Sequence, residues 1–475
     1  MSPSVEPFNE AKYKALMDGL KCKEILLSDT FAATDYFRLE AEYYNSTTVS
    51  YRRALKGKDV AFNIQYGTSK YCDEQKDGHP VLRLNELHNA FIDIPQKYCH
   101  TLSSDEFEKL RLKKGDVLII RTNGNPNLVG RAAVVLEDSN YAFASYLYRV
   151  NTNEQINPET LVAYLNCKYG RYEIDKNSIK GNQTNFSPAK FRDISIPKFD
   201  TALQNIIKNL FDKAYQCRLS ADSEYASAEQ MLISAIGFVD FDSDTNNVAI
   251  KCFSESYTIA GRLDAEYYLP RYDSYINKIG TDETIGSLCN LNDKNYVPNN
   301  EEVYQYIELA DVGCFGNMED VEKVLGKDLP SRARRQVKAG QIIVASVEGS
   351  LQNCALITDE YNNALCSTGF YVLDSNKINS ETLLVLFKSK PIQELLKQRC
   401  SGTILTAITK DELLDIPLPQ IETEAQLEIA KKVRESFALR KQSEQLINLA
   451  KAVVEYAIEK DEEKAIKWIK EKGVE

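Results

Sequence analysis

The chain has 475 residues, 43% hydrophobic and 27% charged, a composition that excludes a disordered protein and predicts about two to four folded domains. The net charge of −11 is uneven, because residues 1–240 hold 30 basic and 31 acidic side chains and the remainder holds 28 and 38. This balance argues against a protein that coats nucleic acid nonspecifically, but it permits reading of base edges by a few side chains.

Metal binding and membrane insertion are not indicated. The eleven cysteines occur singly, and the three histidines (His79, His88 and His100) lack the spacing of metal ligands. The first ten residues are polar and acidic, and no window approaches 18 uninterrupted apolar residues. We therefore expect a cytoplasmic protein without a metal site or a membrane span.

Residues 1–25 are expected to form a helical segment. Residues 38–44 (RLEAEYY) follow, and residues 262–268 (RLDAEYY) repeat them 224 positions later. Six of the seven residues are identical, and the seventh pair, Glu40 and Asp264, keeps its charge. This match is the first sign of an internal duplication.

Five further blocks repeat in the same order, at offsets of 222 to 225. Residues 81–87 and 306–312 alternate as strands do, and residues 114–120 and 339–345 each place a turn glycine before an apolar run typical of a buried strand. The remaining pairs are 145–150 with 368–373, 156–161 with 378–383, and 191–197 with 413–419. A constant offset of this size indicates duplication of a whole domain and not a short solenoid repeat.

Each copy ends in a long helix, predicted over residues 200–236 and 423–458. Apolar residues recur there at spacings of three and four, and Met231 and Leu427 belong to the two stripes. A helix of this length is about 55 Å long. We expect the stripes to bury each other, with a weaker seam at the polar residues 440–445.

The predicted fold is mixed α/β, with two similar globular domains separated by a long antiparallel two-helix coiled coil and related by a pseudo-twofold internal repeat. The expected boundaries are 1–25 for the N-terminal helical segment, 26–197 for the first domain, 198–240 for the first helix, 241–419 for the second domain, 420–460 for the second helix and 461–475 for a C-terminal tail.

Catalytic motifs are missing from the sequence. It contains no phosphate-binding GxxxxGK[ST] loop, no dinucleotide fingerprint, no GxSxG elbow and no Asn-Pro-Pro-aromatic motif of base methyltransferases. We therefore expect a chain that is not itself an enzyme.

Two α/β domains alternating with two long helices resemble the specificity subunit of a type I restriction-modification system. The resemblance rests on the duplicated block at 38–44 and 262–268, on residues 67–71 (GTSKY) and 330–335 (PSRARR), and on the domain-closing pairs Ile196-Pro197 and Leu418-Pro419. It implies that each domain is a target-recognition domain that reads half of a split sequence in double-stranded DNA.

The resemblance also implies partners. The helices would serve as spacer and as dock for two methyltransferase subunits, joined by restriction and translocase subunits. S-adenosylmethionine, ATP and Mg²⁺ would then be bound by those partners, and this chain would hold no cofactor.

Base readers are expected to be polar or basic side chains on loops beside rigid strands. In the first domain the candidates are Thr68, Ser69, Lys70, Tyr71, Arg121, Asn123, Asn125, Lys180, Asn182, Gln183 and Asn185. In the second they are Lys294, Tyr296, Arg332, Arg334, Arg335, Ser346, Ser401 and Thr403.

Structural roles would also explain several of these residues. Residues 67–71 and 123–125 are ordinary turn sequences, and residues 332–335 could contact phosphate or pair with Glu319 and Asp320. The duplicated Arg38 and Arg262 are expected to hold each domain against a helix.

Other functions remain open from the sequence. A single-chain DNA-modifying enzyme would bind S-adenosylmethionine or cut DNA without partners. A coiled-coil interaction scaffold would have no role with DNA. A specificity subunit of a related defence system would have different partners.

Overall fold

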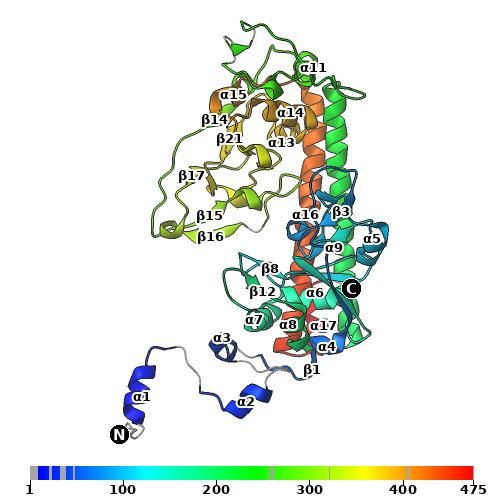
Figure 1. Ribbon diagram of the computed structural model, residues 1–475, viewed down its shortest axis with the longest axis vertical. Coiled ribbons are helices and arrows are strands. Elements are labelled where there is room, and N and C mark those ends of the chain that lie inside the picture. The colour runs from blue at the N-terminus through cyan, green and yellow to red at the C-terminus, as the bar shows by residue number, and fades with distance from the viewer. Residues whose placement is uncertain are drawn as a thin grey trace. The chain divides into compact units, whose positions relative to one another are not determined.

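A computed structural model (Figure 1) describes residues 9–20, 24–32, 39–46, 49–254, 256–257, 261–319, 321–402 and 406–473. The predicted contacts of Arg38 and Thr403 lie outside these residues. The chain forms two compact units: Met1–Cys217 with Gln442–Glu475 makes the first unit, and Arg218–Lys441 makes the second. The mixed α/β composition predicted from the sequence is confirmed in both.

The first unit contains short helices around several small sheets. Its helices are α1 (Glu10–Met17), α2 (Leu27–Ala32), α3 (Ala41–Asn45), α4 (Gly57–Val60), α5 (Ser104–Leu110), α6 (Pro158–Asn166), α7 (Lys168–Asn177), α8 (Pro188–Asp193) and α17 (Glu462–Glu471). Its strands are β1 (Ala54–Lys56), β2 (Ala61–Tyr66), β3 (His79–Leu82), β4 (Leu87–His88), β5 (Phe91–Ile92), β6 (Lys97–Cys99), β7 (Asp116–Ile120), β8 (Thr122–Asn123), β9 (Ala132–Val134), β10 (Ala142–Phe143), β11 (Leu147–Thr152), β12 (Thr184–Asn185) and β13 (Ser195–Pro197).

The second unit is built from a similar set. Its helices are α11 (Pro270–Ile279), α12 (Ile285–Leu288), α13 (Ser380–Lys388), α14 (Lys390–Arg399) and α15 (Lys410–Leu414). Its strands are β14 (Asn290–Asn292), β15 (Val303–Ile307), β16 (Glu322–Leu325), β17 (Ala333–Gln336), β18 (Ile342–Ala345), β19 (Cys354–Leu356), β20 (Leu365–Ser367) and β21 (Phe370–Asp374).

The two units share their strand order. In the first unit β2, β11, β7 and β9 lie side by side, and in the second β14, β21, β18 and β19 do so, with antiparallel neighbours throughout. A second sheet runs β10-β3-β6 in one unit and β20-β15-β16 in the other, parallel and then antiparallel in both. Duplication of a whole domain predicts this agreement.

Two predicted strands are shorter than the sequence suggested. The strand expected at 81–87 ends at Leu82 and the one at 306–312 ends at Ile307, each followed by a 3₁₀ turn. In the first turn the Glu86 carboxylate accepts the Arg83 N–H at 2.6 Å, and in the second Asp311 accepts the Glu308 N–H at 2.7 Å. An acidic side chain that captures the backbone N–H three residues earlier turns the chain and ends the strand.

The two long helices are present as α9 (Thr201–Ala235) and α16 (Thr423–Glu459). In the first unit the buried side chains of Leu203, Ile207 and Leu210 share a core with Ala450 and Val454. In the second unit α9 and α16 share a core through Tyr225, Ala228, Leu232, Ile429 and Val433.

The predicted stripes are narrower than the periodicity suggested. Met231 and Leu427 are 37% and 63% exposed, so neither belongs to the buried seam. A helix buries only the arc that faces its partner, and apolar residues outside that arc remain at the surface.

Arg440, in the polar stretch at 440–445, has specific side-chain partners. The Arg440 guanidinium donates to Asp222 and lies 3.6 Å from the centre of the Phe315 ring, all within the second unit. Nearby, the buried Ser436 hydroxyl donates to the Ala221 carbonyl at 2.7 Å. The Arg440 Nε is buried without a hydrogen-bond partner among the described residues, so the stretch makes specific contacts but its polar groups are not all satisfied.

The predicted C-terminal tail contains the ordered helix α17. Ala465 and Ile469 are buried, and the Trp468 ring stacks on Tyr456 at 5.2 Å. The Glu462 carboxylate accepts from Arg53 at 2.7 Å and from the Asp200 N–H at 2.6 Å, one residue before α9 begins. A carboxylate is favourable there because a helix N-terminus is partially positive.

Candidate nucleic-acid interface

In the first unit three chain segments meet at one edge of the main sheet. Strands β2 and β7 both run antiparallel to β11, so the ends of β2 and β7 adjoin the start of β11. The Arg121 N–H donates to the Tyr146 carbonyl at 2.8 Å, and Thr68 exchanges backbone hydrogen bonds with Phe143 and Ser145. The candidates at 68–71 and 121–125 therefore lie at the same edge.

A small two-stranded sheet brings the third candidate group to this edge. Asn123 in β8 pairs with Thr184 in β12, and the Phe186 N–H donates to the Arg121 carbonyl at 2.7 Å. Asn182 and Gln183, just before β12, are exposed. The turn interpretation also holds in part, because the Asn123 side chain accepts the Asn125 N–H at 2.8 Å.

Several candidate cations already have protein partners. Lys70 pairs with Glu106 at 2.6 Å and donates to the Thr101 carbonyl at 2.8 Å, and its hydrogen bond lowers the pKa of Glu106 to about 2. Lys180 pairs with Asp175 at 2.9 Å. These pairs position the two lysines and leave their side chains 36% and 46% exposed, so they remain able to contact a ligand.

Arg121 is held differently from the two lysines. Its guanidinium lies 5.4 Å from the centre of the Tyr66 ring, and its Nε is buried without a hydrogen-bond partner among the residues that the structure describes. Tyr66 and Tyr146, whose carbonyl accepts the Arg121 N–H, are both partly exposed. An arginine stacked on an aromatic ring keeps its planar fork oriented for bidentate contacts.

The second unit gathers its candidates at the corresponding edge. Strands β14 and β18 are antiparallel to β21, so their ends adjoin its start. The Tyr296 N–H donates to the Arg334 carbonyl at 2.8 Å, and Arg335 donates to the Asp293 carbonyl next to Lys294. Residues 294–296 and 334–335 therefore lie together.

Ser346 and Ser401 are linked through one short segment. The Ser346 carbonyl accepts the Ile408 N–H at 2.9 Å, and Ser401 exchanges backbone hydrogen bonds with Ala407. Lys410 in the same segment pairs with Asp293. Arg332 and Lys294 are exposed.

Arg262 has a structural position. It forms a bidentate pair with Asp264 at 2.6 and 2.8 Å, and it donates to the carbonyls of Gln398 and Cys400 at the end of α14. Its guanidinium also lies 4.3 Å from the centre of the Tyr267 ring. As predicted, this residue holds the 262–268 block against a helix.

Sequence reasoning missed four residues at the first edge: Tyr66, Tyr146, Arg131 and Arg171. The first two are aromatic residues at strand ends and carry no motif. Arg171 lies on α7 and contacts Asn127, 44 residues earlier, and no local pattern signals such a contact. The signal that could have found it is the 222-residue offset, which pairs Arg171 with Gln393.

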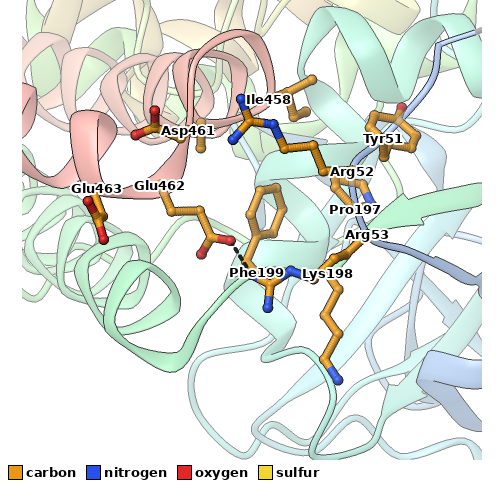
Figure 2. Close-up of a pocket in the computed structure, with 11 residues that line it drawn as sticks. Tyr51, Arg52, Arg53, Pro197, Lys198, Phe199, Ile458, Asp461, Glu462 and Glu463 are labelled. Carbon is orange, nitrogen blue, oxygen red and sulfur yellow. Dashed lines mark hydrogen bonds and ion pairs between the residues drawn. The ribbon is translucent and has the colours of Figure 1, made fainter.

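The first unit also has a cavity of about 420 Å³ away from this edge (Figure 2). Arg52, Arg53 and Lys198 contribute positive charge to its lining, while Asp461, Glu462 and Glu463 contribute negative charge. Arg53 pairs with Asp200 and Glu462, at 3.0 and 2.7 Å. These contacts fasten α17 to the start of α9, and no candidate base reader lines the cavity.

No family model matches the chain. Over 121 residues it is 23% identical to the type I restriction enzyme EcoKI specificity subunit of Escherichia coli (strain K12). The chain resembles a type I specificity subunit. The resemblance predicted from the sequence is thus confirmed over a stretch that spans 25% of this chain and about a quarter (26%) of that relative.

The solved structures that resemble the chain have lower sequence identity to it. The S subunit of the type I restriction-modification system from M. genitalium is 12% identical, with 87% of this chain and 96% of that chain covered and a TM-score of 0.37. The HsdS subunit from Thermoanaerobacter tengcongensis is 13% identical, with 86% and 97% covered and a TM-score of 0.28. Within the described residues, no helix has the length and apolarity needed to span a membrane.

Proposed function

We propose that the chain is the DNA-specificity subunit of a type I restriction-modification complex. The observation that carries this proposal is the duplicated sheet, which in both units places polar and basic loops at the same edge. Each unit would be a target-recognition domain that reads one half of a bipartite sequence in double-stranded DNA. Loops on a rigid sheet suit this task because base readers need fixed positions.

We further propose that α9 and α16 form the predicted antiparallel coiled coil, with one unit toward each end. The shared cores support this, because the first half of α9 packs with the second half of α16 in one unit and the opposite halves pack in the other. The helices would set the spacing of the two half-sites, with boundaries close to 26–197, 198–240, 241–419 and 420–460.

Catalysis belongs to partners in this proposal. Two methyltransferase subunits would dock on the chain and restriction subunits would join them, in the cytoplasm. S-adenosylmethionine, Mg²⁺ and ATP would be bound by those subunits. The acidic net charge fits a subunit that is held on DNA by others, because phosphate neutralisation can come from a basic partner.

Co-expression with the methyltransferase encoded beside it, followed by methylome sequencing, tests the proposal. The expected result is methylation at one split motif, which disappears when this chain is omitted. The purified chain alone should neither methylate nor cut DNA. Activity of the chain alone would favour a single-chain enzyme, and unchanged methylation without it would favour a scaffold.

A further inference from the structure

Two cysteines of the first unit face each other across a pair of extended segments. The Asp73 N–H donates to the Tyr98 carbonyl at 3.0 Å, and the Tyr98 N–H donates back to the Asp73 carbonyl at 2.7 Å. This double exchange makes Asp73 and Tyr98 an antiparallel pair. One residue further along this register, Cys72 and Cys99 form the next opposed pair, which is a pair without mutual backbone hydrogen bonds.

The geometry of such a pair suits a disulfide. Opposed residues without mutual backbone hydrogen bonds have Cα atoms about 4.5 Å apart, and disulfides span Cα separations of about 4.4–6.8 Å. Successive side chains of an extended segment point to opposite faces, so Cys72 and Cys99 share the face opposite to Asp73 and Tyr98. Both cysteines pack in the small hydrophobic cluster that contains Phe107, and both are free thiols.

The two thiols differ in their access to solvent. Cys99 is fully buried, whereas Cys72 is partly exposed. Burial, followed by the neighbouring Cys99 thiol, raises the pKa of the Cys72 thiol to about 11. Because a thiol reacts as its thiolate, Cys72 is the sulfur that a soluble oxidant can reach, and it reacts slowly near neutral pH.

Cys72 directly follows the loop that carries the candidate base readers at 68–71. Two residues beyond it, Glu74 pairs with Lys97 of β6 at 2.7 Å. Noncovalent contacts thus already hold this segment against β6, which bears Cys99. A bond between the two sulfurs would need little backbone movement.

The second unit has no counterpart of this cysteine pair. Tyr304 and Val324 face each other in β15 and β16, as His79 and Cys99 do in β3 and β6, 225 residues earlier. Val324 therefore occupies the position of Cys99. A disulfide at this site would act on the first unit alone.

We propose that Cys72 and Cys99 form a reversible disulfide when the chain meets an oxidant, and that this bond ties the loop at 68–71 to β6. The inference goes beyond the proposed function, because it concerns the chemistry of this chain whether or not the chain reads DNA. In a reducing compartment the pair stays as two thiols, and intracellular disulfides that do form are usually transient or redox-sensing. The bond would couple the mobility of the loop to the redox state.

The oxidant is a small soluble disulfide, for which oxidised glutathione is the probe. The Cys72 thiolate attacks one glutathione sulfur and expels the other as a glutathione thiolate. The Cys99 thiolate then attacks the Cys72 sulfur and expels the second glutathione. The two cysteine protons end on the two expelled glutathiones, so one glutathione disulfide is reduced for each protein disulfide formed.

The test uses the full chain, incubated with glutathione at several ratios of its oxidised to its reduced form. Free thiols are then alkylated in urea, and tryptic peptides are identified by mass. Trypsin cleaves after Lys70, Lys76, Lys97 and Lys109, so peptides 71–76 and 98–109 carry one cysteine each. We expect these two peptides to become linked under oxidised glutathione and to separate again with dithiothreitol.

Three variants make the assignment specific. Cys99→Ala should stop at a mixed disulfide of Cys72 with one glutathione, and Cys72→Ser should leave Cys99 alkylated. Cys217→Ser removes another partly exposed cysteine and should leave the link unchanged. Alkylation of both Cys72 and Cys99 in the wild type at every ratio, or a link from Cys72 to another cysteine, would overturn the proposal.

Hydrogen exchange tests whether the bond fixes the loop. Oxidation of the wild type should slow amide exchange in residues 68–78 by about tenfold, because opening of the segment is then restricted by the covalent tie. Exchange in residues 294–300 of the second unit should not change. Unchanged exchange in 68–78 after the link has formed, or equal slowing in oxidised Cys99→Ala, would show that the disulfide does not hold the loop. Neither result depends on whether the chain binds DNA, so the proposed function stands or fails separately.

Discussion

The two units agree where the sheet meets the long helices and differ where the loops leave the sheet. In the first unit the Gln204 side chain accepts the Asn157 N–H at 2.8 Å, and Asn157 donates back to the Gln204 carbonyl at 3.0 Å. In the second unit Gln426 and Asn379 repeat both hydrogen bonds, at 2.9 Å each. The same two residues, 222 positions apart, thus fasten each domain to the helix that follows it.

The loops show the opposite behaviour. The 121–131 loop contains two arginines and is contacted by Arg171, whereas the 345–353 loop contains one glutamate and is contacted by Gln393 and Lys388. Duplication preserved the contacts between each sheet and its long helix and allowed the exposed loops to diverge. This is the pattern expected if the frame holds two domains alike and the loops read different sequences.

The largest expected loss of stability comes from a substitution inside the main sheet, where the two units differ in one buried contact. In the first unit Arg149 pairs with Asp116 at 3.0 Å, with side chains only 9% and 5% exposed. At the equivalent of Asp116, the second unit has Gln341, which donates to Asp374 at 2.9 Å. Arg149→Met would leave a buried carboxylate without its cation and should lower the free energy of unfolding by about 3–5 kcal/mol.

Urea unfolding of the full chain would measure this loss. Gln341→Ala, at the position equivalent to Asp116, is the comparison variant in the second unit and should cost only about 1–2 kcal/mol, because it removes hydrogen bonds of a neutral side chain and Asp374 keeps its hydrogen bond from Asn290. Equal losses in the two variants would contradict the difference drawn between a buried ion pair and a neutral hydrogen bond.

The hydrogen bonds between glutamine and asparagine that join each domain to its long helix should contribute equally to stability in both units. Gln204→Ala and Gln426→Ala each leave the N–H of a capping asparagine unsatisfied, and each should lower the free energy of unfolding by about 2–3 kcal/mol. The exposed neighbours provide controls, since Asn205→Ala and Glu428→Ala should change it by less than about 0.5 kcal/mol. Losses that differ by more than about 1 kcal/mol between the two glutamines would show that the frames are not equivalent.

A smaller effect, on DNA binding, is expected from a substitution in strand β17 of the second unit. Arg334 is half-buried, and its Nε donates to the Ser331 carbonyl at 3.0 Å. Arg334→Ala should weaken DNA binding a fewfold and reduce its salt slope by about one, without changing the recognised bases. Anisotropy titrations of the complex at several salt concentrations would measure both quantities. A changed methylation motif would instead identify Arg334 as a base reader.

The smallest effect concerns pH and is confined to the first unit. Nε2 and Nδ1 of His100 lie 2.9 and 3.1 Å from Asp73 and Asp77. The hydrogen bond with Asp73 raises the pKa of His100 above its ordinary value and lowers the pKa of Asp73. A raised histidine pKa stabilises the fold below the unfolded value of about 6.5, and this contribution is lost as the pH rises through the folded pKa.

Thermal unfolding of wild type and His100→Gln from about pH 5 to 9 measures this contribution. Wild type should be the more stable at low pH, and the difference should vanish as His100 loses its proton. A difference that stays constant over the range would mean that His100 acts through packing and not through its charge.

Much of the frame could be predicted from the sequence, because periodicity and duplication are local or repeated signals. Spacing alone predicts the two long helices and the buried strands that end at Ile120 and Ala345. It also predicts the pairing of 156–161 with 378–383. The early ends of the strands at Leu82 and Ile307 were missed because each depends on one carboxylate that captures a backbone N–H.

The loop edge was only partly predictable. Asn123 and Gln183 stand out because amides cluster beside strands, and the pairing of Asn123 with Thr184 brings their segments together. Arg171 was not assigned to the same edge, since its contact with Asn127 is long-range and only the 222-residue offset to Gln393 points to its position. Tertiary contacts of this kind become visible only once the sheet order is known.

The central claim is that the two equivalent units each read one half of a split DNA sequence. Methylome sequencing of cells that express the complex with Gln183→Ala, and separately with Lys294→Ala, tests it most directly. Loss of one base contact costs about 1–3 kcal/mol of discrimination, so Gln183→Ala should relax bases in one half of the motif and Lys294→Ala should relax bases in the other half only. Relaxation of both halves by either single variant would contradict the account.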